Sequence, residues 1–376
     1  MIMKAARLSL FPLLAILVFS TSIQDAHAVD QIIRPYQSAR SAAMGGVHLT
    51  TGLYDENFFG NPARAMANPT WRVTVLDPMV EVGTKTISTA GNLTSGGDTL
   101  TKIGDTAGND NHGRFQTTMP AIYIPHIGNE GKWSFAFAFI ESLQFDMDLR
   151  RSFQVSPQAI WDVGPAVTVA RNFKVKDRDL AVGVTPHMTY RISSPQNYGF
   201  SDLIAGKSLS PLQSGGDGTE IDADLGSTYV LPWQLNNFDF SVGAAINNMF
   251  GGNYTGSPRI ANTGNRPLQQ PRSFGMGIAA HKSEFWKFAG ATFALELTDF
   301  GNNPNGGFWR QVHLGGELKW SVLLPRFGIN QGYLCAGVGL DLKHFQLDLT
   351  TYGEELSLNS GGLEDRRYAV HFAFNI

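Results

Sequence analysis

Histidines, carboxylates and basic residues recur at alternate positions of short apolar runs, and such side chains can transfer protons, hold metals or form ion pairs. Catalysis is not predicted, because the histidines fall in separate runs and no Gly-x-Ser-x-Gly motif is present. No metal or other cofactor is predicted, because Asp222-x-Asp224 offers two carboxylates without further ligands. We expect the chain not to be an enzyme and to carry a buried polar network of His187, Arg191, Asp222, Asp224, Glu296, His313, Glu317, Lys319, Arg326, Asp348 and His371.

The runs that carry these residues alternate with a period of two from Thr70 to Ile376. In the last run Tyr368, Val370 and Phe372 share one face, while His371 shares the other with small residues. A soluble β-sandwich also alternates, but its polar face meets water and carries Lys and Glu freely. The pattern therefore predicts a transmembrane antiparallel β-barrel with a lipid-facing apolar surface and a polar lumen.

The number of runs predicts about fourteen strands, and an even number suits a closed barrel. The turn between the eleventh and twelfth is the hardest to place. The predicted strands cover residues 70–83, 115–126, 132–144, 158–173, 178–194, 218–232, 236–248, 267–281, 285–299, 308–322, 324–331, 332–342, 343–353 and 366–376.

The predicted connections alternate between long and short. Four are long, and they span residues 84–114, 199–218, 251–266 and 353–367. Short turns such as residues 128–131 lie between them. In outer-membrane barrels the long loops face the outside of the cell, so we expect that arrangement here.

The amino terminus reads as an export signal. Lys4 and Arg7 precede an apolar run, and Ala26-His27-Ala28 matches the small-x-small cleavage pattern. The alternative, a retained anchor, is disfavoured because the apolar run is too short to cross a bilayer comfortably as a helix. We therefore expect a signal peptide at residues 1–28 and a location in the outer membrane of a Gram-negative-type bacterium.

The composition limits the covalent links and the partners that we expect for this chain. Cys335 is the only cysteine, so no intrachain disulfide can form. The net charge of −3 gives no reason to expect nucleic acid. Outer-membrane lipid is the one partner that the strand pattern itself implies.

The segment before the first predicted strand carries two motifs, Met44-Gly45-Gly46 and Asn61-Pro62-Ala63. Their order resembles the start of FadL-like outer-membrane proteins, which include long-chain fatty acid transporters and PorV-type proteins. Stretches that look like the PorV-type branch follow at residues 222–226, 242–248, 314–317 and 326–333. The chain departs from the usual pattern where Glu56 and Arg64 bracket the second motif, and where it ends in Ile376 rather than Phe.

The resemblance implies that this segment folds inside the barrel as a hatch. We expect three parts: the signal peptide, a hatch or plug at residues 29–69, and the barrel at residues 70–376. The alternative is an ordinary loop and helix beneath the barrel. An internal plug should bring Arg40 or Arg64 to carboxylates of the barrel wall, because buried charges need partners.

Two functions follow from the resemblance. The first is uptake of hydrophobic small molecules, with Leu203, Ile204, Leu209 and Leu212 as an apolar groove in a long loop. The second is a sealed barrel that serves as a binding or secretion platform for a protein partner. An apolar pocket in the lumen would favour uptake, and a packed polar plug would favour the platform.

Overall fold

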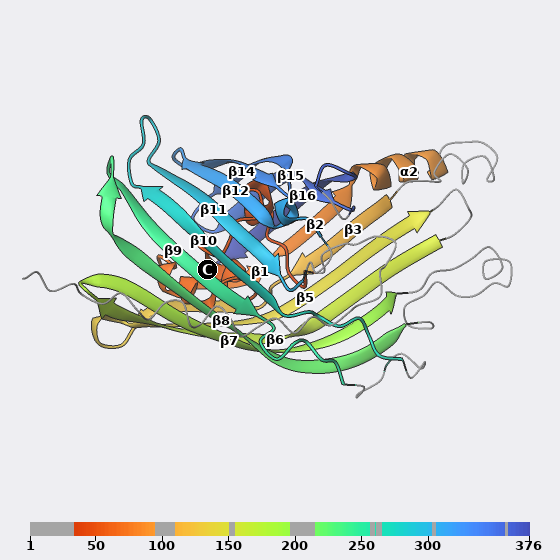
Figure 1. Cartoon of the computed structure of the whole chain (residues 1–376), viewed down its shortest axis with the longest axis horizontal. Helices are drawn as coiled ribbons and strands as arrows, with labels where there is room; N and C mark the ends of the chain where they lie inside the picture. Colours follow the sequence, from red (N-terminus) through yellow and green to blue (C-terminus); the bar gives the residue numbers. More distant parts are fainter. Residues whose placement is uncertain are drawn as a thin grey trace, which may run out of the picture.

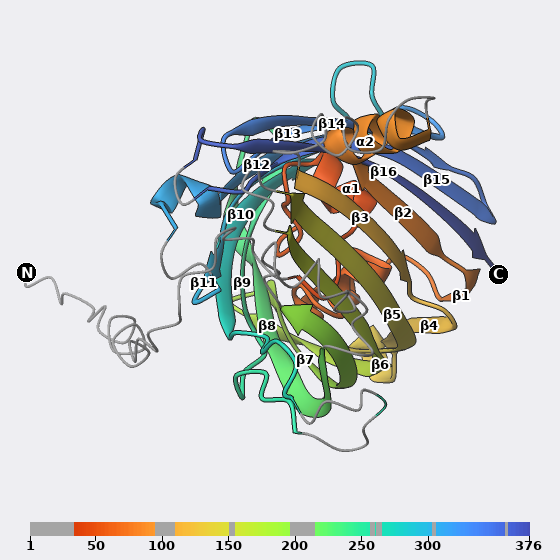
Figure 2. The same ribbon diagram turned by 90° about the vertical axis from the view of Figure 1, so that its right-hand side faces the viewer.

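The computed structural model describes residues 34–94, 110–149, 155–195, 215–255, 260, 265–302, 306–357 and 360–376. The described chain is a closed antiparallel barrel that surrounds a short amino-terminal segment (Figures 1 and 2). No helix in the described part of the chain is long and apolar enough to cross a membrane. The expected signal peptide and the leucine-rich loop groove lie outside the described residues.

The predicted fourteen-stranded barrel is confirmed. Sixteen strand segments form one closed sheet, and they make fourteen strands because two strands are each interrupted once. The segments are β1 (Arg72–Leu76), β2 (Pro78–Gly83), β3 (Asp110–Thr117), β4 (Ala121–Ile127), β5 (Trp133–Leu149), β6 (Val155–Val175), β7 (Arg178–Pro195), β8 (Gly216–Leu235), β9 (Phe238–Asn247), β10 (Ser273–Lys282), β11 (Gly290–Phe300), β12 (Val312–Lys319), β13 (Leu323–Asn330), β14 (Tyr333–Asp341), β15 (Phe345–Glu355) and β16 (Glu364–Asn375).

Both interruptions lie side by side in the wall. β1 pairs with β4 up to Thr74 and Ala121, and β2 resumes pairing with β3 at Pro78 and Thr117. The neighbouring strands β16 and β5 run through continuously. Pro78 and Pro120 lack the backbone N–H that a ladder requires, which explains why the pairing stops here. We call residues 75–77 and 118–120 the wall break.

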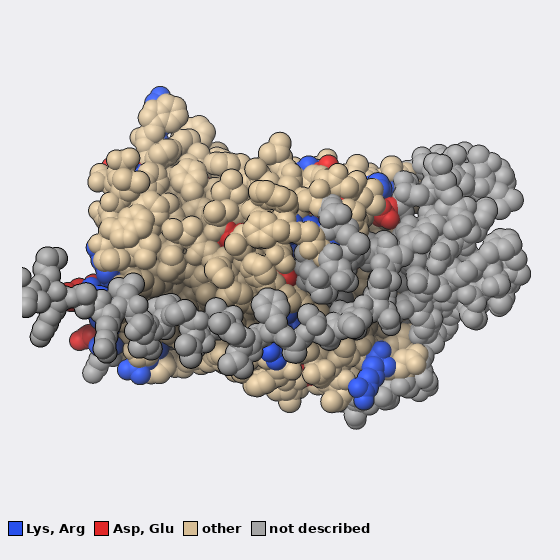
Figure 3. All heavy atoms as spheres, in the orientation of Figure 1, with Lys and Arg blue, Asp and Glu red and all other residues tan. Residues whose placement is uncertain are grey.

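The two faces of the wall differ as the alternation predicts. Phe135, Phe137 and Phe139 of β5 point outward and are exposed, whereas Ser134 and Ala138 are buried inside. The face seen in Figure 3 carries few charged side chains across its middle. An apolar band between polar ends is what a lipid-facing barrel surface requires.

The segment of residues 34–69, here called the plug, lies inside the ring of strands (Figure 2). Its helix α1 (Ala39–Ala43) contacts β13 to β16, and its 3-10 helix η2 (Pro62–Ala67) contacts β4 to β8. A second 3-10 helix, η1 (Tyr54–Asn57), lies between them. Contacts with strands on both sides place the plug across the lumen.

One long connection is structured differently from the prediction. Residues 84–114 were expected to form a loop, because they are rich in Gly, Thr and Asn. Instead, helix α2 (Thr84–Thr94) begins the connection and β3 starts at Asp110. Two further 3-10 helices, η3 (Asn129–Gly131) and η4 (Phe308–Gln311), complete the fold. Because β3 begins at Asp110 rather than at the predicted residue 115, its first residues add polar side chains to the lumen.

Candidate functional site: the plugged lumen

The first plug motif lies against glycines of the wall. Gly45 and Gly46 have φ angles of +72° and +92°, which favour glycine. A Cβ added to Gly315 of β12 would overlap the carbonyl oxygen of Met44, and one added to Gly328 of β13 would lie 2.5 Å from the Met44 carbonyl carbon. The plug backbone therefore passes so close to β12 and β13 that only glycine fits.

The second motif is seated in the same way on the opposite wall. Asn61 donates through Nδ2 to the carbonyls of Leu49 and Ser227, at 2.8 and 3.0 Å. A Cβ on Gly183 would lie 2.5 Å from the Pro62 carbonyl carbon, and one on Gly226 would overlap the Asn61 side chain. Asn61 also caps η2 by accepting from the Ala63 amide at 3.1 Å.

Glu296 of β11 holds the turn between the two motifs. Its carboxylate accepts hydrogen bonds from the amides of His48, Leu49 and Thr50 at 2.8 to 3.0 Å, and from the Thr50 hydroxyl at 2.6 Å. Glu296 is fully buried. Hydrogen bonds to a buried carboxylate are stronger than those between neutral groups. This side chain therefore fixes the plug to the wall at one point.

Two arginines of the plug form ion pairs with the wall. Arg40 pairs with Glu317 of β12 at 2.9 Å and with Glu56 of the plug at 2.9 Å. Arg34 pairs with Asp299 and Glu354, both at 2.8 Å. Arg40 thus lies where an internal plug requires it. Arg64 does not, because its one hydrogen bond in the described chain goes to the Gly52 carbonyl at 3.2 Å.

Several of the predicted network residues meet beside Arg40. Arg326 pairs with Glu317 at 2.7 Å and with Asp348. His371 reaches Asp348 at 3.1 Å and also pairs with Asp77, which lies in the wall break. Thr118, on the other side of the break, donates to Asp77. The network therefore runs from the plug to the break in the wall.

Other predicted residues form a separate group on β7 and β8. Arg191 pairs with Asp162 at 2.6 Å. Asp222 accepts from the amides of Phe250 and Gly252, both at 2.9 Å, and Asp224 accepts from Asn248 at 2.7 Å. These carboxylates hold the stretch of chain that follows β9. No group of three or more His, Cys, Asp or Glu in the described residues has the arrangement of a metal site.

The remaining three predicted residues of the network are His187, His313 and Lys319. His187 is buried, with no hydrogen bond in the described structure, 3.6 Å from Asp224. His313 contacts the Gly45 carbonyl at 2.8 Å and lies 3.9 Å from Asp299. Lys319 is exposed at the end of β12 and forms no ion pair within the described residues.

The predicted network does not include a third polar group in the lumen. His112 of β3 contacts Glu81 at 2.6 Å and Asp146 at 2.5 Å, and Arg367 pairs nearby with Asp365 and Glu354. The predicted loop at residues 84–114 includes His112, so its alternation with Arg114 is not used in the prediction. The sequence nevertheless indicates this group, because His112 and Arg114 lie two positions apart and therefore share one face of a strand.

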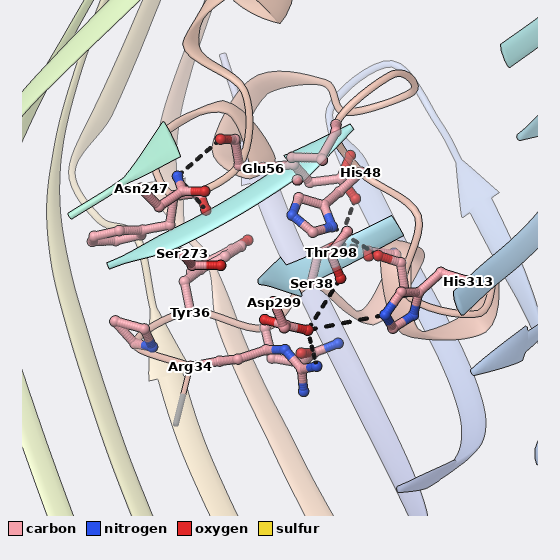
Figure 4. A pocket seen from close by; sticks show the side chains of 18 of the residues that line it. Arg34, Tyr36, Ser38, His48, Glu56, Asn247, Ser273, Thr298, Asp299 and His313 are labelled. Carbon is pink, nitrogen blue, oxygen red and sulfur yellow. Dashed lines mark hydrogen bonds and ion pairs between the residues drawn. The ribbon is translucent and has the colours of Figure 1, made fainter. Parts of the chain in front are cut away.

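The plug separates two cavities. One, of about 90 Å³, faces the end of the barrel that carries the long connections, and includes Arg34, His48, Asp299 and His313 (Figure 4). The other, of about 720 Å³, reaches the opposite end, which carries the short turns. Tyr36, Gln37, Ser38 and Glu56 line both. A short stretch of plug therefore forms the partition between them.

The lumen is apolar on one side of the plug. Tyr54 and Phe58 pack against Ala121, Tyr123 and Ile140 of β4 and β5, with Leu53 and Phe59 beside them. Ala121 directly follows the wall break, and Leu53, Tyr54 and Met79 also line the larger cavity. An apolar patch therefore joins the larger cavity to the break.

No protein-family model and no curated protein matches the chain. Among solved structures, a mutant of the TodX monoaromatic hydrocarbon channel matches with a TM-score of 0.50 at 12% identity, over 91% of this chain and 98% of that one. The toluene transporters TodX of P. putida and TbuX of Ralstonia pickettii align at 11% and 13% identity, each with a TM-score of 0.47 and covering 90% of this chain and 97% of theirs. The match to the TodX mutant agrees with the barrel fold that the FadL-like resemblance implies.

Proposed function

We propose that the chain is an outer-membrane channel for small hydrophobic molecules and that the plug is its hatch. The apolar band on the outer wall, which is exposed in the isolated chain and which lipid would cover, supports this location. The shared fold with a monoaromatic hydrocarbon channel supports the same reading. The cargo would enter at the long-loop end and pass the partition at Tyr36 to Ser38.

The observation that carries this proposal is the wall break beside the apolar patch. Transfer of a hydrophobic molecule from water into an apolar site is worth about 25 cal/mol per Å² of apolar surface buried. A polar, water-filled lumen does not provide this free energy, so the cargo needs an apolar site along its path. The side chains around Tyr54 and Phe58 are packed against the wall and would offer such a site once the plug moves. The break next to them interrupts the hydrogen-bonded wall. Cargo could leave sideways toward lipid at this point rather than cross the polar cavity.

The polar contacts of the plug favour a second proposal. Glu296, Arg34 and Arg40 hold the plug through buried hydrogen bonds and ion pairs. A packed polar plug suits a sealed barrel whose loops bind a secreted protein. Under that reading the wall break is a structural kink, and no cargo passes.

Uptake by intact cells separates the two proposals. Phospholipid vesicles are unsuitable, because small hydrocarbons dissolve in their bilayers without a channel. A Gram-negative strain that lacks its own hydrocarbon channels would express the full chain, and accumulation of labelled toluene and of labelled oleate would be compared with an empty-vector strain. We expect faster accumulation of at least one compound. If both compounds accumulate at the same rate as in the empty-vector strain, although the barrel is shown to be folded in the outer membrane, the channel is contradicted and the platform remains.

A further inference from the structure

The three arginines of the plug do not have equivalent partners. Arg34 and Arg40 each contact two carboxylates at 2.8 to 2.9 Å. Arg64 makes no ion pair in the described part of the chain, and only its Nε donates, to Gly52. The outer edge of its guanidinium, formed by the two Nη atoms, has no recorded protein partner there.

Arg64 lines the cavity of about 720 Å³. The same cavity is lined by Asp239, His281, Lys319 and Asp341, which lie at strand ends beside the short turns. A solute at that end of the barrel can therefore approach Arg64 through water. A cavity of this volume can hold small organic ions as well as inorganic ones.

The nearby carboxylates are already engaged. Glu56 accepts from Ser38, Arg40 and the Leu53 amide, and Glu317 pairs with Arg40 and Arg326. Turning either toward Arg64 would break these contacts. A half-buried charge without an ionic partner is costly. Burial and the neighbouring Arg40 lower the pKa of Arg64 to about 10, which expresses the same cost.

A second cation lies along the cavity. The Arg72 guanidinium stacks on the Tyr54 ring, with its Cζ 3.7 Å from the ring centroid. Arg72 also lines the cavity and forms no recorded ion pair within the described residues. Stacking leaves the edge of a guanidinium free for hydrogen bonds. Arg64 and Arg72 are thus two cations of a mixed-charge cavity that form no ion pair in the described part of the chain.

We propose that Arg64 is an oxyanion-binding residue that takes a carboxylate or phosphate group of a small soluble molecule from the short-turn end of the barrel. Two parallel hydrogen bonds from a guanidinium edge match the two oxygens of such a group. The anion supplies the partner that the wall provides to Arg34 and Arg40, and so stabilises the plug in its closed position. This inference does not depend on which cargo, if any, the barrel passes.

The test uses the full mature chain, refolded in nonionic detergent. Binding of inorganic phosphate and of acetate is measured by titration calorimetry, and the unfolding temperature is followed against chloride at equal ionic strength. We expect one saturable site and an unfolding temperature that rises with phosphate or acetate, because ligands that bind only the folded state stabilise it. Octanoate serves as a third probe, because it carries the same carboxylate on an alkyl chain.

The variants are Arg64→Gln, Arg64→Lys and, as a matched control, Lys343→Gln in an exposed turn at the same end. Arg64→Gln should lose the calorimetric site, Arg64→Lys should weaken it at least tenfold, and Lys343→Gln should bind as the original chain does. If Arg64→Gln fails to fold, the Lys variant still tests the fork geometry. Binding that Arg64→Gln or Arg64→Lys retains in full would overturn the inference, as would binding of octanoate but of neither phosphate nor acetate.

Discussion

The plug is held differently on its two sides. On one side, β11 to β13 contact it through the Glu296 carboxylate, the Arg40–Glu317 pair and the glycines 315 and 328. On the other side, β4 to β6 contact it mainly through an apolar patch around Tyr54 and Phe58, next to the wall break. Only two side-chain hydrogen bonds in the described residues join β4 and β5 to the plug there, from Ser134 to the Ala65 carbonyl and from His126 to the Asn68 carbonyl. Directional polar contacts fix a position, whereas apolar contacts tolerate sliding and repacking. Because polar and glycine contacts also hold the second motif on β7 and β8, the difference indicates a plug that is anchored there and on β11 to β13 and can yield beside the wall break.

Removing the Glu296 carboxylate should have the largest effect on the anchored side. Glu296→Ala leaves three amides and one hydroxyl of the plug without their acceptor, and we expect a loss of about 3–5 kcal/mol in unfolding free energy. Urea unfolding from lipid vesicles measures it. On the apolar side, Ile140→Val should cost only about 0.5–1.5 kcal/mol. Equal losses in the two variants would remove the contrast between the two sides.

Adding a methyl group to Gly315, where the plug backbone touches β12, should have the next largest effect. In Gly315→Ala the new Cβ would overlap the Met44 carbonyl, and we expect a cost of about 1–3 kcal/mol together with displacement of the plug. Gly113→Ala of β3 is the matched control, because nothing lies within 4 Å of the added Cβ. Channel conductance in planar bilayers should rise for the first variant alone. If neither variant changes the unfolding free energy or the conductance, the plug does not contact β12 as described.

Asp55 should give the smallest effect, as a pH dependence. Burial and the neighbouring Asp77 raise the pKa of Asp55 to about 7. A raised carboxyl pKa means that the folded chain holds a proton that the unfolded chain releases near pH 4, so stability falls as the pH rises from about 4 to about 7 and then levels off. Asp55→Asn keeps an acceptor for the Tyr36 hydroxyl and should flatten this slope by on the order of 1 kcal/mol between pH 5 and 8. An unchanged slope would show that Asp55 does not titrate in this range.

Much of the barrel was predictable, because alternation is a local property. The runs at 324–331 and 332–342, whose turn was hardest to place, correspond closely to β13 and β14. The wall break was not predicted, although Pro78 and Pro120 marked it, since each lies in a run that otherwise alternates. β3 was cut short, because its first residues are the kind that form loops.

The contacts of the lumen were less predictable, because they join residues far apart in the chain. Arg40 was expected to reach a wall carboxylate, and its pairing with Glu317 crosses 277 positions. Arg64 was expected to do the same, and its guanidinium instead faces the cavity without a recorded carboxylate. No periodicity distinguishes the two arginines. Only the three-dimensional position of η2 does.

The most direct test of the proposed exit closes the wall break with a covalent bond. The side chains of Asp77 and Thr118 touch across the break, so Asp77→Cys/Thr118→Cys in a Cys335→Ser background offers a disulfide at that point. The control is Leu349→Cys/Val370→Cys, a directly opposed pair on the continuous wall of β15 and β16. Uptake of labelled hydrocarbon by intact cells is measured under oxidising and reducing conditions. The account predicts that oxidation stops uptake in the first pair, that reduction restores it, and that the control pair is insensitive. Undiminished uptake through a fully oxidised Asp77→Cys/Thr118→Cys pair would contradict it.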